Sequence, residues 1–491
     1  MSTTTTETLA ARVFPRLYRD SVTLMALAST VEKRDGVERV GAVMGTPGNL
    51  TILERSGMRP DDLAPAPDDL VVVVRGVDEE TVAAALDAAE AGLTAVESAR
   101  SSHEAPAPQT IHEGLAVGDR ATVATVSTPG TYAPVVVEQA LRAGLHVFCF
   151  SDNVPLEDEV RLKALAAEQR LLLMGPDCGT AILEGVPLGF ANAVRRGPVG
   201  IVAASGTGAQ EVSCLLHRAG TGVSQLVGVG GRDLSSAVGG TMTHLALDLL
   251  AEDEATQVVV VVSKPPAAEV AERLLERLTG LGKPAVACLL GEDDRDGAVP
   301  VRGTLEGGAR AAAELAGATL QLGEDVAVPD ASALPAARGV LGLYTGGTLA
   351  SEAKVVLRHA GVPAEVLDLG DDEYTAGRPH PMIDPSGRSE QVVQAGGRPE
   401  IGILLVDLVL GYGAATDPAT PLAEAVAEAM AVARADGRDL LVLGSVCGTD
   451  ADPQDIAHAR RTLASAGVLV HPSNAAAART AVAVATRKEL A

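Results

Sequence analysis

The stretch PVGIVAASGTG (residues 198–208) predicts a short buried strand that ends in a turn of glycines and hydroxyls. The stretch GVLGLYTGGT (residues 339–348) has the same plan, and a helix is expected directly after each turn. Glycine lets the backbone approach a ligand closely, and the first turn of a helix offers unpaired N–H groups and a positive dipole end. The two stretches therefore favour two anion-binding α/β modules in one chain.

Composition narrows the class of protein. The 491 residues carry a formal net charge of −25, and 47% of them are hydrophobic although only 2% are aromatic and tryptophan is absent. A chain of this length exceeds one ordinary hydrophobic core, so several domains with cores of Val, Leu, Ile and Ala are expected. The negative charge would repel a phosphate backbone, so we expect no nucleic-acid partner.

Cysteine spacing and hydropathy bear on location. The five cysteines include no Cys-x-x-Cys pair, which is typical of reduced thiols that are mostly buried. The Thr-rich start has no targeting signature, and apolar runs such as residues 258–262 are far shorter than a membrane span. We therefore expect a cytoplasmic protein without membrane segments. No spacing typical of metal ligands is visible.

Alternating strand and helix patterns predict a multi-domain α/β chain. Residues 1–12 are expected to form a loose tail, and residues 13–97 a small N-terminal α/β domain of split βαβ type. A Rossmann-like domain with parallel strands is predicted over residues 111–195. Two further doubly wound domains, residues 197–325 and 338–491, repeat one plan of strand, glycine turn and helix.

Three motifs resemble the alpha subunit of succinyl-CoA synthetase. GPDCGT (175–180), ASGTG (204–208) and GVGGRD (228–233) occur in this order, and similar segments of that subunit line its CoA and phosphohistidine sites. Residues 338–491 look like the ligase portion of the beta subunit. The resemblance implies that the Rossmann-like domain is of the CoA-binding type and that the last two domains are flavodoxin-like ligase domains.

A narrower resemblance covers nearly the whole chain. The motifs that carry it are FSDNVPLEDE (150–159), VSKPP (262–266), LYTGGT (343–348) and GRPHPMIDP (377–385). They resemble the FdrA family of acyl-CoA-synthetase-like proteins. FdrA-like proteins are associated with carbamoyltransferase complexes in ureide, allantoin and purine breakdown that act on oxamate-type N-carbamoyl compounds.

The chain departs from the synthetase pattern in three ways. The synthetase carries phosphate on a histidine in a Gly-His-Ala-Gly loop, whereas residues 291–298 contain no histidine. Ser263-Lys264 stands where the synthetase has a glutamate, and no ATP-grasp module is recognised. The resemblance therefore implies first a carbamoyltransferase subunit. The alternatives are an acyl-CoA synthetase or CoA transferase, and a non-catalytic scaffold that binds CoA or a nucleotide.

The candidate site residues follow from the turns and from the resemblance. Lys264 follows a strand, where open α/β sheets bind ligands, Arg232 is a candidate clamp, and Arg378 with His380 forms a cation–base pair. The candidate residues for phosphate or substrate binding are Ser205, Gly206, Thr207, Gly208, Gly346, Gly347 and Thr348. Those of a CoA-like pocket are Ser127, Thr128, Pro129, Gly130, Pro176 and Asp177.

Each candidate also has a purely structural interpretation. Glycine turns are often only turns, Lys264 is then a solvated strand end, and Arg232 pairs only with Asp233. Residues 378–381 are then a loop stiffened by prolines. The resemblance leaves the cofactor open between none, CoA and a nucleotide. It implies a small anionic substrate such as carbamoyl phosphate or an oxamate-like acid, neighbouring partner subunits, and a homo- or hetero-oligomer.

Overall fold

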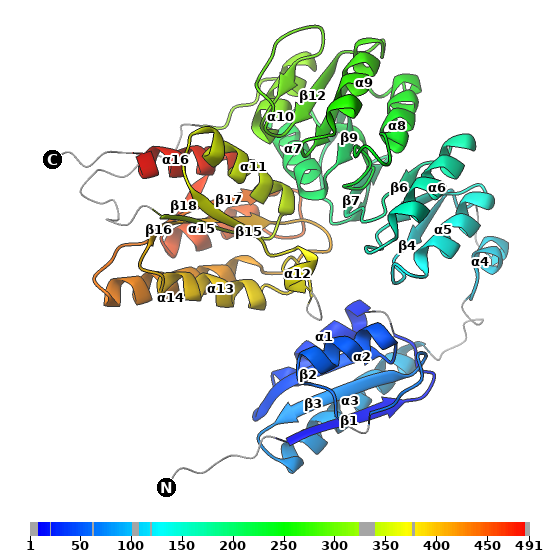
Figure 1. The fold of residues 1–491 in the computed structure, drawn as a ribbon, viewed down its shortest axis with the longest axis vertical. Coiled ribbons are helices and arrows are strands. Elements are labelled where there is room, and N and C mark those ends of the chain that lie inside the picture. The colour runs from blue at the N-terminus through cyan, green and yellow to red at the C-terminus, as the bar shows by residue number, and fades with distance from the viewer. Residues whose placement is uncertain are drawn as a thin grey trace. The chain divides into compact units, whose positions relative to one another are not determined.

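The computed structural model describes residues 8–19, 21–60, 63–100, 108–117, 120–323, 339–375 and 379–486. The chain forms two compact units, the first made chiefly of residues up to 108 and the second of most residues from 109 onward (Figure 1). No helix in these described ranges is both long and apolar enough to cross a membrane.

The N-terminal unit is an antiparallel three-stranded sheet with helices on both faces. Its elements are β1 (Thr8–Phe14), α1 (Ser21–Glu32), β2 (Val37–Met44), α2 (Pro47–Arg55), β3 (Leu70–Gly76) and α3 (Glu79–Arg100), with strand order β1-β3-β2. The five apolar residues that start β3 are fully buried, because α1 and α3 cover one face of this central strand and α2 packs toward the other. This agrees with the small α/β domain predicted there.

The start of the chain corrects one prediction. Residues 8–12, expected to belong to a loose tail, form most of β1 and pair in register with β3. Leu9, Ala11 and Val13 alternate along β1 and pack into one apolar cluster. Burial of this face therefore stabilises these residues as a strand. Helix α2 was also not predicted, although Thr46 caps it and Pro47 starts it.

The second unit begins with a parallel sheet in the order β4-β5-β6. Its strands are β4 (Val123–Val126), β5 (His146–Cys149) and β6 (Leu173–Met174), and its helices are α4 (Ile111–Val117), α5 (Ala133–Arg142) and α6 (Leu156–Glu168). Parallel strands joined by helices match the Rossmann-like prediction.

A seven-stranded sheet follows in the order β13-β12-β11-β9-β10-β7-β8. Its strands are β7 (Thr180–Leu183), β8 (Val186–Gly189), β9 (Arg196–Ala204), β10 (Val223–Gly228), β11 (Val258–Ser263), β12 (Ala285–Leu289) and β13 (Val301–Arg302). Its helices are α7 (Gly206–Arg218), α8 (Thr241–Glu252), α9 (Ala268–Thr279) and α10 (Leu305–Leu315). The antiparallel strands β7 and β8 extend this sheet, whereas we expected their residues in the Rossmann-like domain.

The last sheet is parallel throughout, in the order β15-β14-β16-β17-β18. Its strands are β14 (Gly339–Tyr344), β15 (Ala364–Asp368), β16 (Ile401–Val409), β17 (Leu441–Cys447) and β18 (Val468–His471). Its helices are α11 (Gly347–His359), α12 (Asp372–Thr375), α13 (Ser386–Gly396), α14 (Ala419–Ala435), α15 (Ile456–Ser465) and α16 (Asn474–Thr486). Figure 1 shows α13 and α14 on one face and α11 and α16 on the other.

The two larger sheets share one apolar core. Buried residues of α7 and α10 belong to the same cluster as buried residues of α11 and α16. Their strands are near-continuous runs of Val, Leu and Ile, because helices cover both faces of parallel sheets. This common core places the two glycine turns, which lie at the starts of α7 and α11, in one region.

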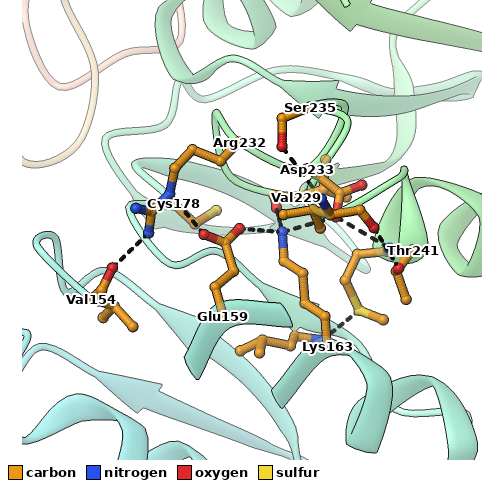
Figure 2. A network of polar contacts seen from close by, with 12 residues as sticks. Val154, Glu159, Lys163, Cys178, Val229, Arg232, Asp233, Ser235 and Thr241 are labelled. Atoms are coloured by element: carbon orange, nitrogen blue, oxygen red, sulfur yellow. Dashed lines mark hydrogen bonds and ion pairs between the residues drawn. The ribbon is translucent and has the colours of Figure 1, made fainter. Parts of the chain in front are cut away.

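A buried charged network joins α6 to the loop between β10 and α8 (Figure 2). The Nζ of Lys163 lies 2.8 Å from both Glu159 Oε1 and Asp233 Oδ1 and donates to the carbonyl of Val229 at 2.9 Å. Asp233 also accepts from the backbone N–H and hydroxyl of Thr243. All three charged side chains are buried, so each depends on its partners for stability.

Replacing Lys163 tests the importance of this network. The Lys163→Met variant should lose about 3 kcal/mol or more of unfolding free energy, because Glu159 and Asp233 keep buried charges without their cation. Urea unfolding of the full chain measures the loss. Glu252→Gln, which breaks the exposed pair with Arg170, is the control and should change the stability by less than about 1 kcal/mol. Equal effects of the two variants would contradict the prediction.

Candidate functional site

The two glycine turns meet at the starts of two helices. Ser205 is the N-cap of α7, and its Oγ accepts from the N–H of Gly208 at 3.1 Å. The same Oγ lies 2.7 Å from Oγ1 of Thr348 in α11, and the N–H of Thr348 donates to Oγ1 of Thr207 at 3.2 Å. Residues 205–208 and 345–348, called the paired turns below, therefore bring two positive helix ends together.

A buried carboxylate shapes the second of the paired turns. Asp407 accepts from the N–H and the hydroxyl of Thr345 and from the N–H of Gly346, each at 2.8 Å. Arg388 lies 3.0 Å from Asp407, and burial lowers the pKa of its guanidinium although the carboxylate opposes this effect. Because Asp407 already accepts from the N–H of Gly346, this predicted anion donor serves the turn itself.

Two other glycines are required by the protein's own packing. A Cβ at Gly208 would collide with Ser205 Oγ, and one at Gly347 would collide with Asp368 Oδ2. Within the described chain, the amide N–H groups of Gly206, Thr207 and Gly347 have no hydrogen-bond acceptor. These three donors lie at the two helix ends and suit an anionic ligand.

A lysine and two carboxyl groups gather beside the paired turns. Lys264 follows β11 and is exposed, and its charge acts on both Asp177 and Asp368. Burial, followed by the charges of Asp152 and Asp372, raises the pKa of Asp177 to about 6 although its side chain still contacts solvent. Burial also raises the pKa of Asp368. Lys264 therefore lies beside two carboxyl groups whose pKa values burial raises.

Sequence reasoning missed Asp368 and gave Asp177 a different role. Asp368 ends β15, and its position at the carboxyl end of a parallel strand was a usable signal. Asp177 follows β6 and has a φ of +56°, a backbone conformation that is strained for residues other than glycine. We had placed Asp177 only in a CoA-like pocket.

Arg232 is held by a different partner from the one considered. Its Nε lies 2.7 Å from Glu159 Oε2, and its Nη2 donates to the carbonyl of Val154 at 2.8 Å (Figure 2). Asp233 pairs with Lys163 instead, so the structural interpretation in which Arg232 pairs only with Asp233 is wrong. The side chain of Arg232 remains 45% exposed. Its positive charge partly offsets the effect of burial on the pKa of Asp177.

His380 lies at the edge of this region as a neutral ring. Its Nδ1 accepts from the N–H of Met382 at 3.2 Å, which assigns the proton to Nε2, and its ring centroid lies 5.7 Å from that of Phe190. Burial lowers the pKa of His380, so the ring is uncharged at neutral pH. Arg378, its predicted partner, lies outside the described residues.

Comparison with known proteins places the chain in a family. The uncharacterized protein YahF of Escherichia coli K12, an FdrA-like protein, is 38% identical over 94% of this chain and 95% of its own length. The chain belongs to the FdrA-like, succinyl-CoA-synthetase-like acyl-CoA synthetases. A CoA-ligase family profile matches residues 343–484 of this FdrA-like chain, and the profile "AllF, heavy metal-associated domain" matches residues 7–109.

A more distant relative and a structural neighbour accompany this match. Succinate–CoA ligase subunit alpha 1 of Archaeoglobus fulgidus is 29% identical over 41% of the FdrA-like chain and 68% of its own length. The apo acetyl-coenzyme A synthetase 1 of Ca. Korarchaeum cryptofilum is a structural neighbour with 15% identity and a TM-score of 0.34, covering 77% of this chain and 85% of its own.

The name of the N-terminal profile raises the question of a heavy metal. Residues 7–109 contain no cysteine, and their one histidine, His103, lies outside the described residues. Heavy-metal sites depend on soft thiolate or imidazole ligands, so the donors of this FdrA-like chain do not fit such a site. The match therefore carries no metal chemistry here.

The predicted CoA-like pocket is partly filled by the protein itself. A Cβ at Gly130 would collide with the backbone of Asp152 and Asn153, so glycine is needed there for the packing of two loops. Thr128 has a buried Oγ1 without a hydrogen-bond partner in the described structure. Ser127, Pro129 and Pro176 flank this region, and their role in binding CoA stays a prediction.

The turn at Thr345 gives a test of this geometry. Asp407→Asn removes the charge that pairs with the buried guanidinium of Arg388. The free energy of unfolding of this variant should therefore be about 3 kcal/mol lower than that of the wild type. Chemical denaturation followed by circular dichroism measures the difference. Asp417→Asn, which alters an exposed carboxylate that accepts from the N–H of Thr420, is the matched control. A loss no larger than that of the control would show that Asp407 does not organise the turn.

Proposed function

We propose that this FdrA-like chain is a subunit of a carbamoyltransferase complex that moves a carbamoyl group between a small N-carbamoyl acid or ureide and phosphate. The observation that carries the proposal is the pair of positive helix ends with free N–H donors beside Lys264. Such donors suit phosphate and an anionic acid. The resemblance to FdrA-like proteins supports the choice of reaction and the proposed role in ureide and purine nitrogen catabolism.

The proposed step has a simple balance of bonds and protons. An oxygen of hydrogen phosphate attacks the carbamoyl carbon, and the bond from this carbon to the amide nitrogen of the acid breaks. The nitrogen gains a proton, the phosphate loses one, and the products are carbamoyl phosphate and an oxamate-like amide. Asp177 gives its proton to the nitrogen and regains it from phosphate. The free N–H groups and Lys264 stabilise the oxyanion of the tetrahedral centre.

The stretch that replaces the phosphohistidine loop supports this choice over phosphoryl transfer. Residues 291–298 contain four acidic residues and no histidine. Asp294 accepts from the N–H of Gly303 at 2.9 Å, and Asp296 pairs with Arg302 at 2.6 Å. The loop is therefore braced by its own contacts and offers no histidine to carry phosphate.

An acyl-CoA ligase or CoA transferase is the second candidate. The succinate–CoA ligase relative and the CoA-ligase profile favour it. In that case CoA or a nucleotide would bind to the Rossmann-like domain. A third candidate is a non-catalytic scaffold for such a ligand. In each case we propose small anionic ligands and partner subunits encoded nearby.

A direct assay separates these candidates. The purified chain, alone and with proteins encoded beside its gene, is incubated with carbamoyl phosphate and oxamate, and phosphate release is measured. Release should require both substrates and partner subunits, and it should fall at least about 100-fold in Ser205→Ala and Lys264→Ala because oxyanion donors and charges contribute this much. Thr304→Ala, another helix N-cap, and Lys354→Ala, an exposed lysine of α11, are the controls.

The outcomes of the assay are distinct. CoA thioester formation without partners would reject carbamoyl transfer in favour of ligation. Activity that survives both variants in an otherwise competent complex would identify the chain as a scaffold.

The pH profile tests the role of Asp177. In the direction from N-carbamoyl acid and phosphate, a protonated Asp177 is needed to protonate the leaving nitrogen, so the rate in this direction should fall as the pH rises above about 6, the pKa of this group. Asp177→Asn should abolish this limb and lower the rate. Asp152→Asn removes a neighbouring charge that raises the pKa of Asp177, so it should move the limb to lower pH. A limb that stays in place in both variants would exclude Asp177 as the acid.

A further inference from the structure

Two glutamates occupy equivalent positions behind the paired turns. Glu211 is the sixth residue of α7 and Glu352 the sixth residue of α11, counted from the first residue of each helix. Both side chains are buried, with relative exposures of 4% and 0%. They therefore lie about one and a half turns behind the two helix ends that meet at Ser205 and Thr348.

One buried asparagine links the two glutamates. The side-chain amide of Asn474, the first residue of α16, donates to Glu352 Oε2 at 2.7 Å, and its backbone N–H donates to Glu211 Oε1 at 3.3 Å. The N–H of Leu305, the first residue of α10, donates to Glu352 Oε1 at 2.6 Å. The Oδ1 of Asn474 is buried without a partner in the described structure, so it lacks the donor that a protonated carboxyl group would supply.

The charge state of this pair changes near neutral pH. The pKa values of Glu211 and Glu352 are raised to about 7, chiefly by burial. For Glu352, the charge of Glu211 contributes to this rise. The next carboxylate, Glu306 of α10, has a lowered pKa even though burial opposes this, because Ser473, Arg479 and Arg310 hold its charge. Glu306 therefore stays ionised while the pair titrates.

The other groups that face the pair do not titrate between pH 6 and 8. Burial lowers the pKa of the Arg460 guanidinium of α15, which nevertheless stays charged and favours an ionised Glu211. Burial raises the pKa of Cys288 and Tyr344, which stay neutral. The thiols of Cys214 and Cys447, 4.0 Å apart beside Glu211, also have raised pKa values. Among these groups, the two glutamates are therefore the ones whose charge changes in this range.

We propose that Glu211 and Glu352, linked by the N–H groups of Asn474, are positioning residues that in their protonated form hold α7 and α11 in the alignment that closes the paired turns. Loss of their protons leaves two buried carboxylates on adjoining helices, and their repulsion and desolvation separate the helix starts. The consequence for phosphate binding rests on the proposed function, whereas the alignment itself requires no ligand.

The sign of the pH effect follows from linkage. A glutamate with a pKa near 7 in the folded state and an ordinary value near 4.5 when unfolded binds more protons when folded. The stability of the closed arrangement is therefore fully present at acidic pH and declines as the pH rises to about 7. The paired turns should open more often at pH 8 than at pH 6.

Hydrogen exchange of the full chain without ligand tests the proposal. After correction for intrinsic exchange, amide protection in peptides that cover residues 205–216 and 347–357 should fall about tenfold between pH 6 and 8 for each titrating group. Glu352→Gln and Glu211→Gln, which stay neutral, should each reduce this fall. Glu314→Gln, an exposed change on α10, is the matched control and should leave it intact. Amide protection that does not change with pH in the wild type would overturn the proposal. A fall in both Gln variants as large as the fall in the wild type would also overturn it.

A second measurement keeps the test independent of the variants' folding. Infrared spectra of the wild-type chain and of Asp177→Asn, which removes another carboxyl group that titrates near pH 6, should both show a buried protonated carboxyl band at pH 6 that disappears by pH 8. A band that is absent at pH 6 would also overturn the proposal. Neither measurement involves carbamoyl transfer. A chain that lacks the proposed reaction can therefore be distinguished from one in which Glu211 and Glu352 are not protonated at pH 6.

Discussion

The meeting of two helix N-termini is the constraint on which the candidate site depends. Each helix end carries about half a positive charge, so α7 and α11 repel one another where Ser205 contacts Thr348. The apolar cluster shared by α7, α10, α11 and α16 holds them in place from behind. Asp407 adds negative charge at the start of α11 and fixes the turn before it. The site is thus an electrostatically unfavourable contact that packing maintains, and an anion would relieve it.

The glycines of the paired turns show how one residue type serves both structure and function. Gly208 and Gly347 lack a side chain because Ser205 and Asp368 occupy the space. The N–H of Gly346 is committed to Asp407. Free donors remain at Gly206, Thr207 and Gly347, so the turn is shaped by internal contacts and offers only part of its backbone to a ligand. A motif alone does not distinguish these roles.

Much of the fold was predictable because its signals are local. The Val-rich strands and the glycine turns of both larger sheets follow from hydrophobic runs and backbone requirements. Strands β1 and β7 were missed or misplaced because their pairing with β3 and β10 is decided by tertiary contacts. The partner of Arg232 was missed for the same reason, since Glu159 is distant in sequence. The equivalence of Glu211 and Glu352 is visible in the aligned turns, but only their joint burial behind Asn474 gives it meaning.

The carboxyl groups around the paired turns differ in pKa from ordinary carboxyl groups. The chain is strongly acidic, yet four carboxyl groups around the paired turns, Asp177, Asp368, Glu211 and Glu352, have pKa values raised chiefly by burial. Burial therefore favours the neutral form of these groups where the helix ends meet, and the charges of Asp177, Glu211 and Glu352 change between about pH 6 and 7. Local protonation lets an acidic protein present a positive site, and the same protonation makes that site sensitive to pH in the range where these carboxyl groups titrate.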